Sequence, residues 1–193
     1  MSSQQGPPSS VDSFFFFFYT QDMHLMIDLE TLATTPNAAI LTIGACKFDP
    51  QATDIHSTYY ERIVLETQEE YGRVINEDTL AWWSQQDKQI QEDAFGEGDD
   101  RIDLRDAMKK LYTFGLGTTN VWSHGAIFDV VIIEDICRSL QQAVTWKFWE
   151  VRDTRTLFDL ADVSVRIEGK HNALTDAVAQ AKAVQQSYAK LKV

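Results

Sequence analysis

The sequence has few of the residues that build covalently linked or membrane-embedded proteins. Only two of its 193 residues are cysteines, and Cys46 and Cys137 lie within the apolar runs ILTIGACKF and DVVIIEDIC. This usage excludes a disulfide framework and a metal–thiolate cluster, and it favours a reducing, cytosolic setting. The sequence also lacks an apolar run of the roughly 20 residues that a membrane helix needs, so we expect no membrane contact.

Positive charge is scarce as well. Lys and Arg number 17 against 29 Asp and Glu, which gives a net charge of −12. The protein as a whole therefore repels nucleic acid at long range, and a polyanionic substrate must be held locally. The length, with 44% hydrophobic and 24% charged residues, predicts one globular domain with a sizeable core.

The first 22 residues differ in composition from the rest. They contain Ser, Gln, Gly and Pro and then an aromatic run from Phe14 to Tyr19, without Lys or Arg. A secretory signal needs a basic start and a longer apolar stretch, and this segment has neither. We predict that residues 1–22 form a disordered extension, or precede a natural start at Met23, and that residues 23–193 form the domain. The alternative is that the aromatic cluster docks on a partner.

Hydrophobic patterns predict an α/β domain. Three strands joined by short polar turns open it as an antiparallel meander, followed by helix, strand, helix and helix. This order resembles the RNase H-like fold, a mixed β-sheet flanked by helices in a single domain. Leu174, Leu191 and the positions spaced three and four between them predict one buried face on the last helix. The strands are expected near residues 24–30, 38–48, 55–65 and 119–125, and the helices near 77–86, 103–114, 126–140 and 172–190.

Acidic residues stand where apolar elements present their side chains. Asp28 and Glu30 alternate on the first strand, so both point to one face, roughly 6 to 7 Å apart, and can share metal ions. Asp129 falls in the first turn of an apolar helix, where a charge that offsets the helix dipole is the alternative. Asp176 lies beside core residues of the last helix. His171 precedes that helix, and taken singly it has the position of an ordinary surface histidine.

Together these motifs resemble the DEDDh group of 3′→5′ exonucleases. Asp-x-Glu on the first strand, Gly-x-x-x-Asp ending at Asp129, and His171 with Asp176 in His-x-x-x-x-Asp follow the order of that family. The resemblance covers the chain from about Met23 to its end. TLAWWSQQ (79–86) and KFWEVRDTRTL (147–157) are similar to the phage exonuclease A group and to small bacterial exoribonucleases.

The resemblance implies a chemistry for these residues. Asp28, Glu30, Asp129 and Asp176 would hold two divalent cations, Mg²⁺ or Mn²⁺, about 3.5 to 4 Å apart. His171 would take the proton from the attacking water, and nucleoside 5′-monophosphates would be released. Family members often carry Asn or a small residue where this chain has His124, so His124 would line the scissile site or compete as the base.

Substrate contacts are expected from a second group of residues. Trp82 and Trp83 are neighbours on a predicted helix and cannot both face the core, so one would present its indole to a base or ribose; packing by both is the alternative. Arg152 and Arg155 lie in a stretch, Lys147 to Lys170, where five basic residues balance five acids. They would contact phosphates, or form an internal Arg-Asp network. Thr31, directly after the acid pair, joins the expected contacts.

Three functions follow from the sequence, led by an exonuclease acting on single-stranded DNA or RNA 3′ ends. An RNase H-like endonuclease shares the four carboxylates but does not require the spacing of His171 and Asp176. A domain that binds nucleic acid or a partner without cleaving it has no need to bury acids that repel one another. Exposed aromatics and limited positive charge would suit a homodimer that completes the substrate groove. A bacterial cytosol, or that of a phage-infected host, is the expected location.

Overall fold

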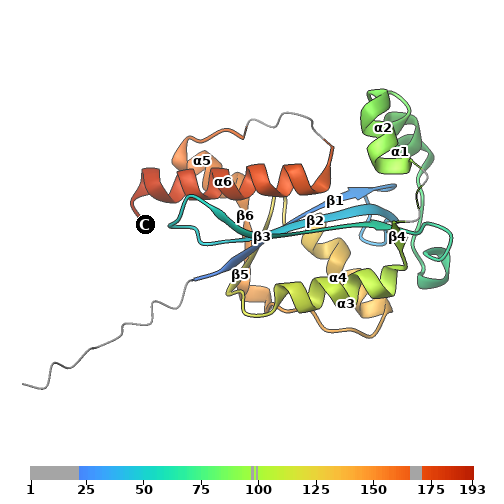
Figure 1. Cartoon of the computed structure of the whole chain (residues 1–193), viewed down its shortest axis with the longest axis horizontal. Helices are drawn as coiled ribbons and strands as arrows, with labels where there is room; N and C mark the ends of the chain where they lie inside the picture. The colour runs from blue at the N-terminus through green and yellow to red at the C-terminus, as the bar shows by residue number, and fades with distance from the viewer. Residues whose placement is uncertain (1–21, 97, 99, 166–170) are drawn as a thin grey trace, which may run out of the picture.

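The structure is a computed structural model that describes residues 22–96, 98, 100–165 and 171–193. The predicted extension over residues 1–22 lies outside the described residues except for Asp22. Within the described part, one sheet is flanked by helices on both faces (Figure 1). Its strands are β1 (His24–Thr31), β2 (Ile40–Phe48), β3 (Ile55–Ile63), β4 (Arg101–Ile102), β5 (Asn120–Ser123) and β6 (Val151–Asp153). Its α-helices are α1 (Glu77–Trp83), α2 (Lys88–Phe95), α3 (Leu104–Gly115), α4 (Asp129–Ser139), α5 (Thr154–Ala161) and α6 (Ala173–Leu191), with 3₁₀ turns η1 (Glu69–Tyr71) and η2 (Phe148–Glu150).

The strand order β4-β3-β2-β1-β5-β6 places β1 inside the sheet. β1, β2 and β3 pair antiparallel, as the meander predicts, and β5 then pairs parallel to β1. The predicted mixed sheet with flanking helices in one domain is confirmed. The sequence patterns missed β4, β6, α2 and α5, and they began α4 at Ala126 rather than Asp129. Strands of two or three residues are too short to show an alternation, so pairing with their neighbours defines them.

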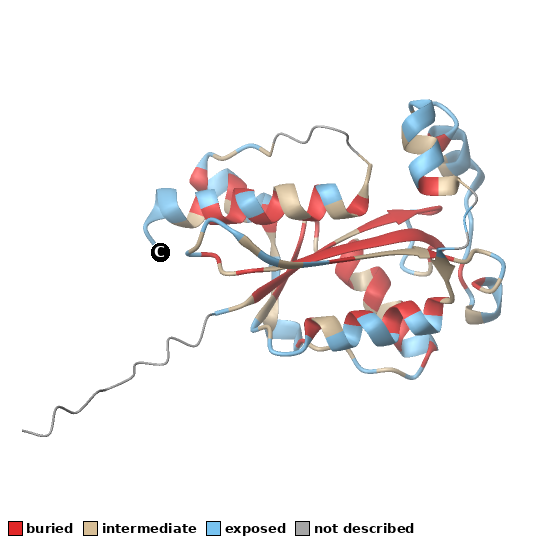
Figure 2. Cartoon of the chain, in the orientation of Figure 1, coloured by how far each residue is buried: buried red, intermediate tan, exposed pale blue. Residues whose placement is uncertain are grey.

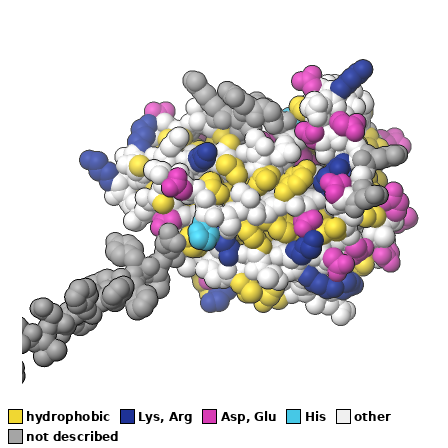
Figure 3. Space-filling view, in the orientation of Figure 1, with side chains coloured by type: hydrophobic (Ala, Val, Ile, Leu, Met, Phe, Trp, Pro, Cys, Tyr) yellow, Lys and Arg dark blue, Asp and Glu magenta, His cyan; other side chains and the backbone are white. Residues whose placement is uncertain are grey.

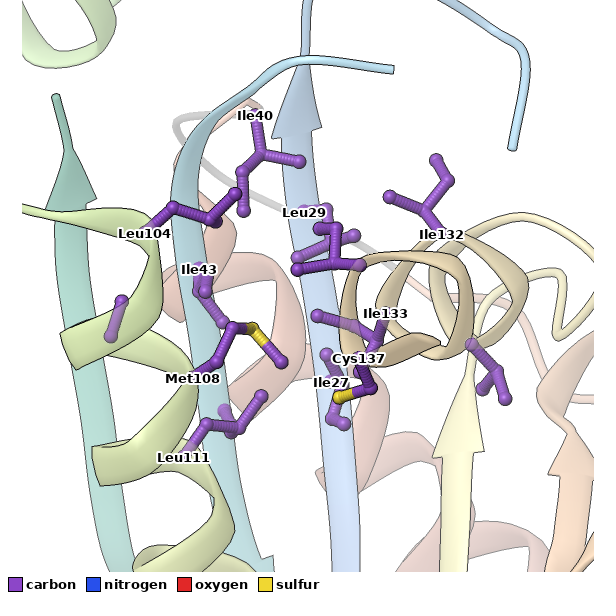
Figure 4. Packing of buried hydrophobic residues seen from close by; sticks show 14 of the residues in the cluster. Ile27, Leu29, Ile40, Ile43, Leu104, Met108, Leu111, Ile132, Ile133 and Cys137 are labelled. Atoms are coloured by element: carbon purple, nitrogen blue, oxygen red, sulfur yellow. The ribbon is translucent and has the colours of Figure 1, made fainter. Parts of the chain in front are cut away.

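The two faces of β1 serve different layers. Leu25, Ile27 and Leu29 pack with α3 and α4 in one core cluster, as Figure 4 shows for Ile27 and Leu29. Met26 faces the opposite layer, where it packs with residues of α5 and α6. The strands at the centre of the sheet are accordingly buried on both sides (Figure 2). Because side chains alternate along a strand, Asp28 and Glu30 share the face of Met26 and point toward α6.

The start of α6 lies very close to the sheet. Gly44 of β2 pairs with Asp28 of β1, and a Cβ atom at Gly44 would overlap the backbone of Ala173. Asn172 caps the helix by accepting a hydrogen bond from the backbone N–H of Thr175 at 3.0 Å. A residue without a side chain in β2 therefore lets the first turn of α6 rest on the strand next to the acid pair.

The buried face of α6 differs in part from the prediction. Ala177, Ala181 and Val184 are buried as expected, but Leu191 is 39% exposed. The polar residues Asp176 and Gln180 are buried instead. The last turn of α6 adds little to the core, while its first turns carry polar groups inward.

Within the part of the chain that the structure describes, no helix combines the length and the apolar character needed to cross a bilayer. Acidic side chains are frequent at the end of the molecule that carries α1, α2 and η1 (Figure 3).

Candidate active site

Three carboxylates from two elements meet between β1 and α6. One oxygen each of Asp28, Glu30 and Asp176 lies within 4.8 Å of the others. The strand contributes two of them because positions i and i+2 share a face, and the first turns of α6 contribute the third. Glu30 and Asp176 are buried, and Asp28 is half-buried. The structure thus brings together predicted site residues that lie about 150 positions apart along the chain.

Asp129 joins this group from the opposite layer. It is the first residue of α4 and is buried, and its Oδ1 accepts a hydrogen bond from the backbone N–H of Leu29 at 3.2 Å. Leu29 stands between Asp28 and Glu30, so the bond ties α4 to the acid pair. A charge that serves only the helix dipole would be free to face solvent, and the burial of Asp129 argues against that alternative.

Burial and mutual repulsion shift the acids toward their neutral forms. Burial, followed by the charges of Asp129 and Glu30, raises the pKa of Asp28 well above its usual range. Burial, followed by Asp176 and Asp129, raises the pKa of Glu30 to about 8. Burial raises the pKa of Asp129 to about 7, although the amide of Leu29 opposes this. These carboxylates need positive charge nearby to stay ionised at neutral pH.

The donor set fits divalent cations. Hard carboxylate oxygens are the ligands that Mg²⁺ and Mn²⁺ prefer. Among the described residues, no Lys, Arg or His side chain forms an ion pair with Asp28, Glu30 or Asp129. A cation bound among these oxygens would supply positive charge in direct contact with them.

His171 lies at the edge of the acid cluster. Its backbone has a φ of 70°, in the left-handed region that few residues other than glycine adopt. Its backbone N–H donates to Oδ2 of Asp176 at 3.2 Å, so the histidine and this acid are held together. The centroid of its ring lies 4.9 Å from that of Trp82 and 6.3 Å from that of Trp83, edge to face in both cases.

The two tryptophans occupy different environments. Trp83 is 2% exposed, and its indole N–H donates to the backbone carbonyl of Thr31 at 2.9 Å. Trp82 is 42% exposed and contacts the ring of His171. Thr31 is buried, and its hydroxyl donates to the carbonyl of Ala33. Of this group, Trp82 alone combines exposure with contact to the predicted base.

The remaining predicted residues divide between the site and its surroundings. Nδ1 of His124 lies 2.8 Å from the hydroxyl of Thr154, which holds the imidazole against α5. Arg155 is exposed, lies against Gly125 and acts electrostatically on Asp129. Arg152 instead donates to the carbonyls of Trp149 and Val151. The structure thus places Arg155 near Asp129, whereas the guanidinium of Arg152 lies on the backbone of residues 149–151. Contacts of either arginine with a phosphate stay predictions.

The expected Arg-Asp network takes another form. Asp153 accepts hydrogen bonds from the backbone N–H groups of Ala126 and Arg155 at 2.8 and 2.9 Å. In the described residues no ion pair joins its carboxylate to either arginine. Asp153 therefore caps α5 and fixes the loop before α4.

The sequence of the chain is similar to those of known proteins. The sequence model of the 3′-5′ exoribonuclease Rv2179c-like domain matches residues 23–188. The chain belongs to this family. It is a 3′→5′ exonuclease, a hydrolase, as the DEDDh motifs imply. An exodeoxyribonuclease of Enterobacteria phage T4 is 23% identical over 158 residues, which make up 68% of this chain and 68% of that protein.

Solved structures share the fold of the exonuclease. A zinc-bound complex of E. coli exonuclease I with single-stranded DNA matches with a TM-score of 0.61 at 13% identity, over 89% of this chain and 41% of that one. The nuclease domain of 3′hExo, a DEDDh family member bound to rAMP, matches with a TM-score of 0.53 at 14% identity, over 91% of this chain and 93% of that one. This chain therefore spans about two-fifths of the exonuclease I chain.

One residue of the site escaped the sequence analysis. Nε2 of Gln180 donates to Oδ1 of Asp28 at 2.8 Å, and Gln180 is 3% exposed. Glutamine is common on helix surfaces and gives no signal by itself. Its spacing of four residues from Asp176, which places both on one helix face, is the signal that could have revealed it.

Proposed function

We propose that this exonuclease uses divalent cations to remove nucleotides one at a time from single-stranded or 3′-overhanging nucleic acid and releases nucleoside 5′-monophosphates. The observation that carries the proposal is the convergence of Asp28, Glu30 and Asp176, whose oxygens lie within 4.8 Å of one another. Asp129 supports it from α4 through its bond to the backbone between Asp28 and Glu30. Burying acids that repel one another costs stability, which a cation would offset.

In this proposal the four acids, Asp28, Glu30, Asp129 and Asp176, would hold two cations, Mg²⁺ or Mn²⁺. When bound, these would activate a water and offset charge on the phosphate and the leaving 3′ oxygen. The protein's own contribution is position: β1 and α6 fix the carboxylates, and α4 fixes Asp129.

His171 would act as the general base. An imidazole near neutral pH suits proton transfer from water. The backbone bond of His171 to Asp176 keeps it beside the acids, and its ring rests against Trp82. His124 would be the weaker candidate, because its Nδ1 already faces Thr154 and burial lowers its pKa. The exposed indole of Trp82 would stack on the terminal base or ribose.

We infer that the substrate is single-stranded. Whether its sugar is ribose or deoxyribose is decided by the digestion experiment below. The family is described by exoribonuclease activity, and the phage T4 relative is named for DNA. Among the structural neighbours, one was captured with single-stranded DNA and one with rAMP. The buried free thiols of Cys46 and Cys137 fit the cytosol proposed from the sequence, and a homodimer stays a prediction.

The test is digestion of matched 5′-labelled DNA and RNA oligonucleotides, single-stranded and with 3′ overhangs, with Mg²⁺, Mn²⁺ or EDTA. We expect a ladder that shortens from the 3′ end, release of 5′-monophosphates, and no product in EDTA. Circular single strands should stay intact, since they have no 3′ end. Cleavage of circles would indicate an endonuclease, and the absence of any ladder with either metal would overturn the proposal.

The general base is tested separately with His171→Ala and His124→Ala. We expect His171→Ala to lower kcat by about 10²–10⁴-fold, the usual contribution of a positioned base, and to bind Mn²⁺ like the wild type. His124→Ala should retain most of the activity. Unchanged turnover in His171→Ala would transfer the role to His124 or to water alone.

A further inference from the structure

We propose that Gln180 is a positioning residue of the active site, which orients the carboxylate of Asp28 so that it can hold a divalent cation. This inference rests on the metal-dependent function proposed above and deepens it. The direct observation is the hydrogen bond from Nε2 of Gln180 to Oδ1 of Asp28, at 2.8 Å between a helix and a strand that are 152 residues apart. Gln180 is 3% exposed, so water does not compete freely for this bond.

The bond follows from matched spacings on two elements. Asp28 and Glu30 are two residues apart on β1, a rise of roughly 6.6 Å. Gln180 and Asp176 are four residues apart on α6, a rise of about 6 Å on one helix face. α6 begins beside the end of β1 and runs back along it (Figure 1). Gln180 therefore meets Asp28 while Asp176 meets Glu30, and the absent side chain of Gly44 permits the close approach.

A structural purpose for Gln180 is not apparent elsewhere. In the described residues, the bond to Asp28 is the one hydrogen bond of its side chain, and its Oε1 is buried without a partner. Gln185 on the same helix differs, because its Nε2 donates to the backbone carbonyls of Asp49 and Asp54 at 3.0 Å each. Gln185 ties α6 to the β2–β3 turn, whereas Gln180 contacts a predicted metal ligand.

The amide has the chemistry that this position requires. A carboxylate has two oxygens and about four lone-pair sites, so one donated hydrogen bond fixes its orientation and leaves sites for a cation. A lysine could donate as well, but its permanent charge among the acids would compete with the cation. A glutamine is neutral, so it can orient Asp28 without offsetting the negative charge of the acids. That charge then remains available to attract the cation. Groups that orient metal ligands in this way typically contribute 10- to 100-fold to metal affinity or activity.

The experiment compares Gln180→Met with Gln185→Met in the full chain. Both changes keep side-chain length and remove an amide from the buried side of α6. Mn²⁺ affinity is measured by calorimetry after removal of metal, together with the Mn²⁺ concentration for half-maximal digestion and the KM for a labelled oligonucleotide. We expect Gln180→Met to weaken Mn²⁺ binding by about 10- to 100-fold and to shift half-maximal digestion in parallel, with KM unchanged.

The control separates positioning from folding. Gln185→Met should lower the thermal midpoint and keep the Mn²⁺ affinity of the wild type. If Gln180→Met does not fold, as judged by circular dichroism, Gln180→Asn carries the test, because its amide is one methylene too short to reach Asp28. A folded variant at position 180 with wild-type Mn²⁺ affinity would overturn the positioning role alone. A wild-type protein that neither binds Mn²⁺ nor digests either oligonucleotide would overturn the proposed function and this inference together.

Discussion

Adjacent residues with the same side chain have separate tasks in this protein. Trp82 and Trp83 follow one another on α1, and the turn of the helix directs one inward and one outward. The indole N–H of Trp83 donates to the backbone carbonyl of Thr31 at the end of β1, while the ring of Trp82 contacts the ring of His171. Two neighbouring positions on α1 thus contact the core and the predicted base, respectively.

We predict that replacements at these two positions separate activity from stability. Trp82→Ala should lower kcat/KM by about 5- to 150-fold, because base stacking contributes about 1–3 kcal/mol. Its free energy of unfolding should change little. Trp83→Phe should lose about 1–3 kcal/mol of stability, because the buried carbonyl of Thr31 loses its donor. Urea denaturation and steady-state kinetics measure both; equal losses of stability in the two variants would contradict this division.

His24 at the start of β1 is a second residue whose environment sets its chemistry. It is 2% exposed, its Nδ1 accepts from the indole N–H of Trp122 at 2.9 Å, and its ring stacks on that indole. Burial lowers the pKa of His24 below its usual 6.5, although Asp22 opposes the shift. The folded state therefore favours the neutral imidazole of His24, whose Nδ1 is free to accept the bond from Trp122.

This pKa gives a pH dependence with a definite sign. Because the pKa of the folded state is the lower one, the unfolded chain binds more protons, and the stabilising contribution of neutral His24 is complete above pH 6.5. It is lost as the pH falls from 6.5 through the lowered value. We predict that the stability difference between wild type and His24→Gln shrinks between pH 7.5 and 5, measured by urea denaturation. A difference that stays constant over this range would refute it.

At the scale of elements, the contact between α6 and β2 decides the geometry of the site. α6 carries Asp176 and Gln180, and Gly44 allows its first turn to lie on the sheet. A shift of this helix would move both residues away from Asp28 and Glu30. Metal affinity should therefore depend on a glycine that contributes no ligand.

We predict that Gly44→Ala weakens both the fold and the metal site. The added methyl group would overlap the backbone of Ala173, and such overpacking costs about 1–3 kcal/mol or more. The displaced α6 should also lower Mn²⁺ affinity. Gly117→Ala is the matched control: its φ of 82° strains an alanine, but no atom lies within 4 Å of the added carbon. Gly117→Ala should lose stability and keep its metal affinity; unchanged Mn²⁺ binding in Gly44→Ala would show that α6 can adjust.

At the scale of the whole molecule, the acids come from both helical layers and from the strand between them. Asp129 reaches the site from the α3–α4 side and Asp176 from the α5–α6 side, with Asp28 and Glu30 on the strand between them. A cation bound among them would connect both helical layers through β1. Metal binding should consequently stabilise the entire fold.

We predict that Mn²⁺ raises the melting temperature, and more so at pH 8 than at pH 6. The raised pKa values, about 8 for Glu30 and about 7 for Asp129, mean that protons compete with the cation at the lower pH. Without metal, the contribution of these acids to stability is lost as the pH rises through those values. Differential scanning fluorimetry with K⁺ at matched ionic strength is the control, and Asp28→Asn should abolish the shift. An equal shift at both pH values would count against a carboxylate site.

The sequence by itself determined the long elements and the order of the acids. β1 and β2 are recognisable from their apolar runs and α6 from its three-and-four spacing, so the position of Asp28 beside Glu30 on one strand could be read directly. The order of apolar and polar residues within one strand or helix is a property of that segment alone, so it can be recognised in the sequence.

Only the tertiary structure decided which distant groups meet. The bond between Gln180 and Asp28, the inward turn of Trp83 and the separation of Arg155 from Arg152 each depend on how α6, α1 and β6 pack on the sheet. The strands β4 and β6 have two and three residues, and exist because a neighbouring strand pairs with them. Contacts between segments far apart in the chain form when the layers close, and no period within either segment encodes them.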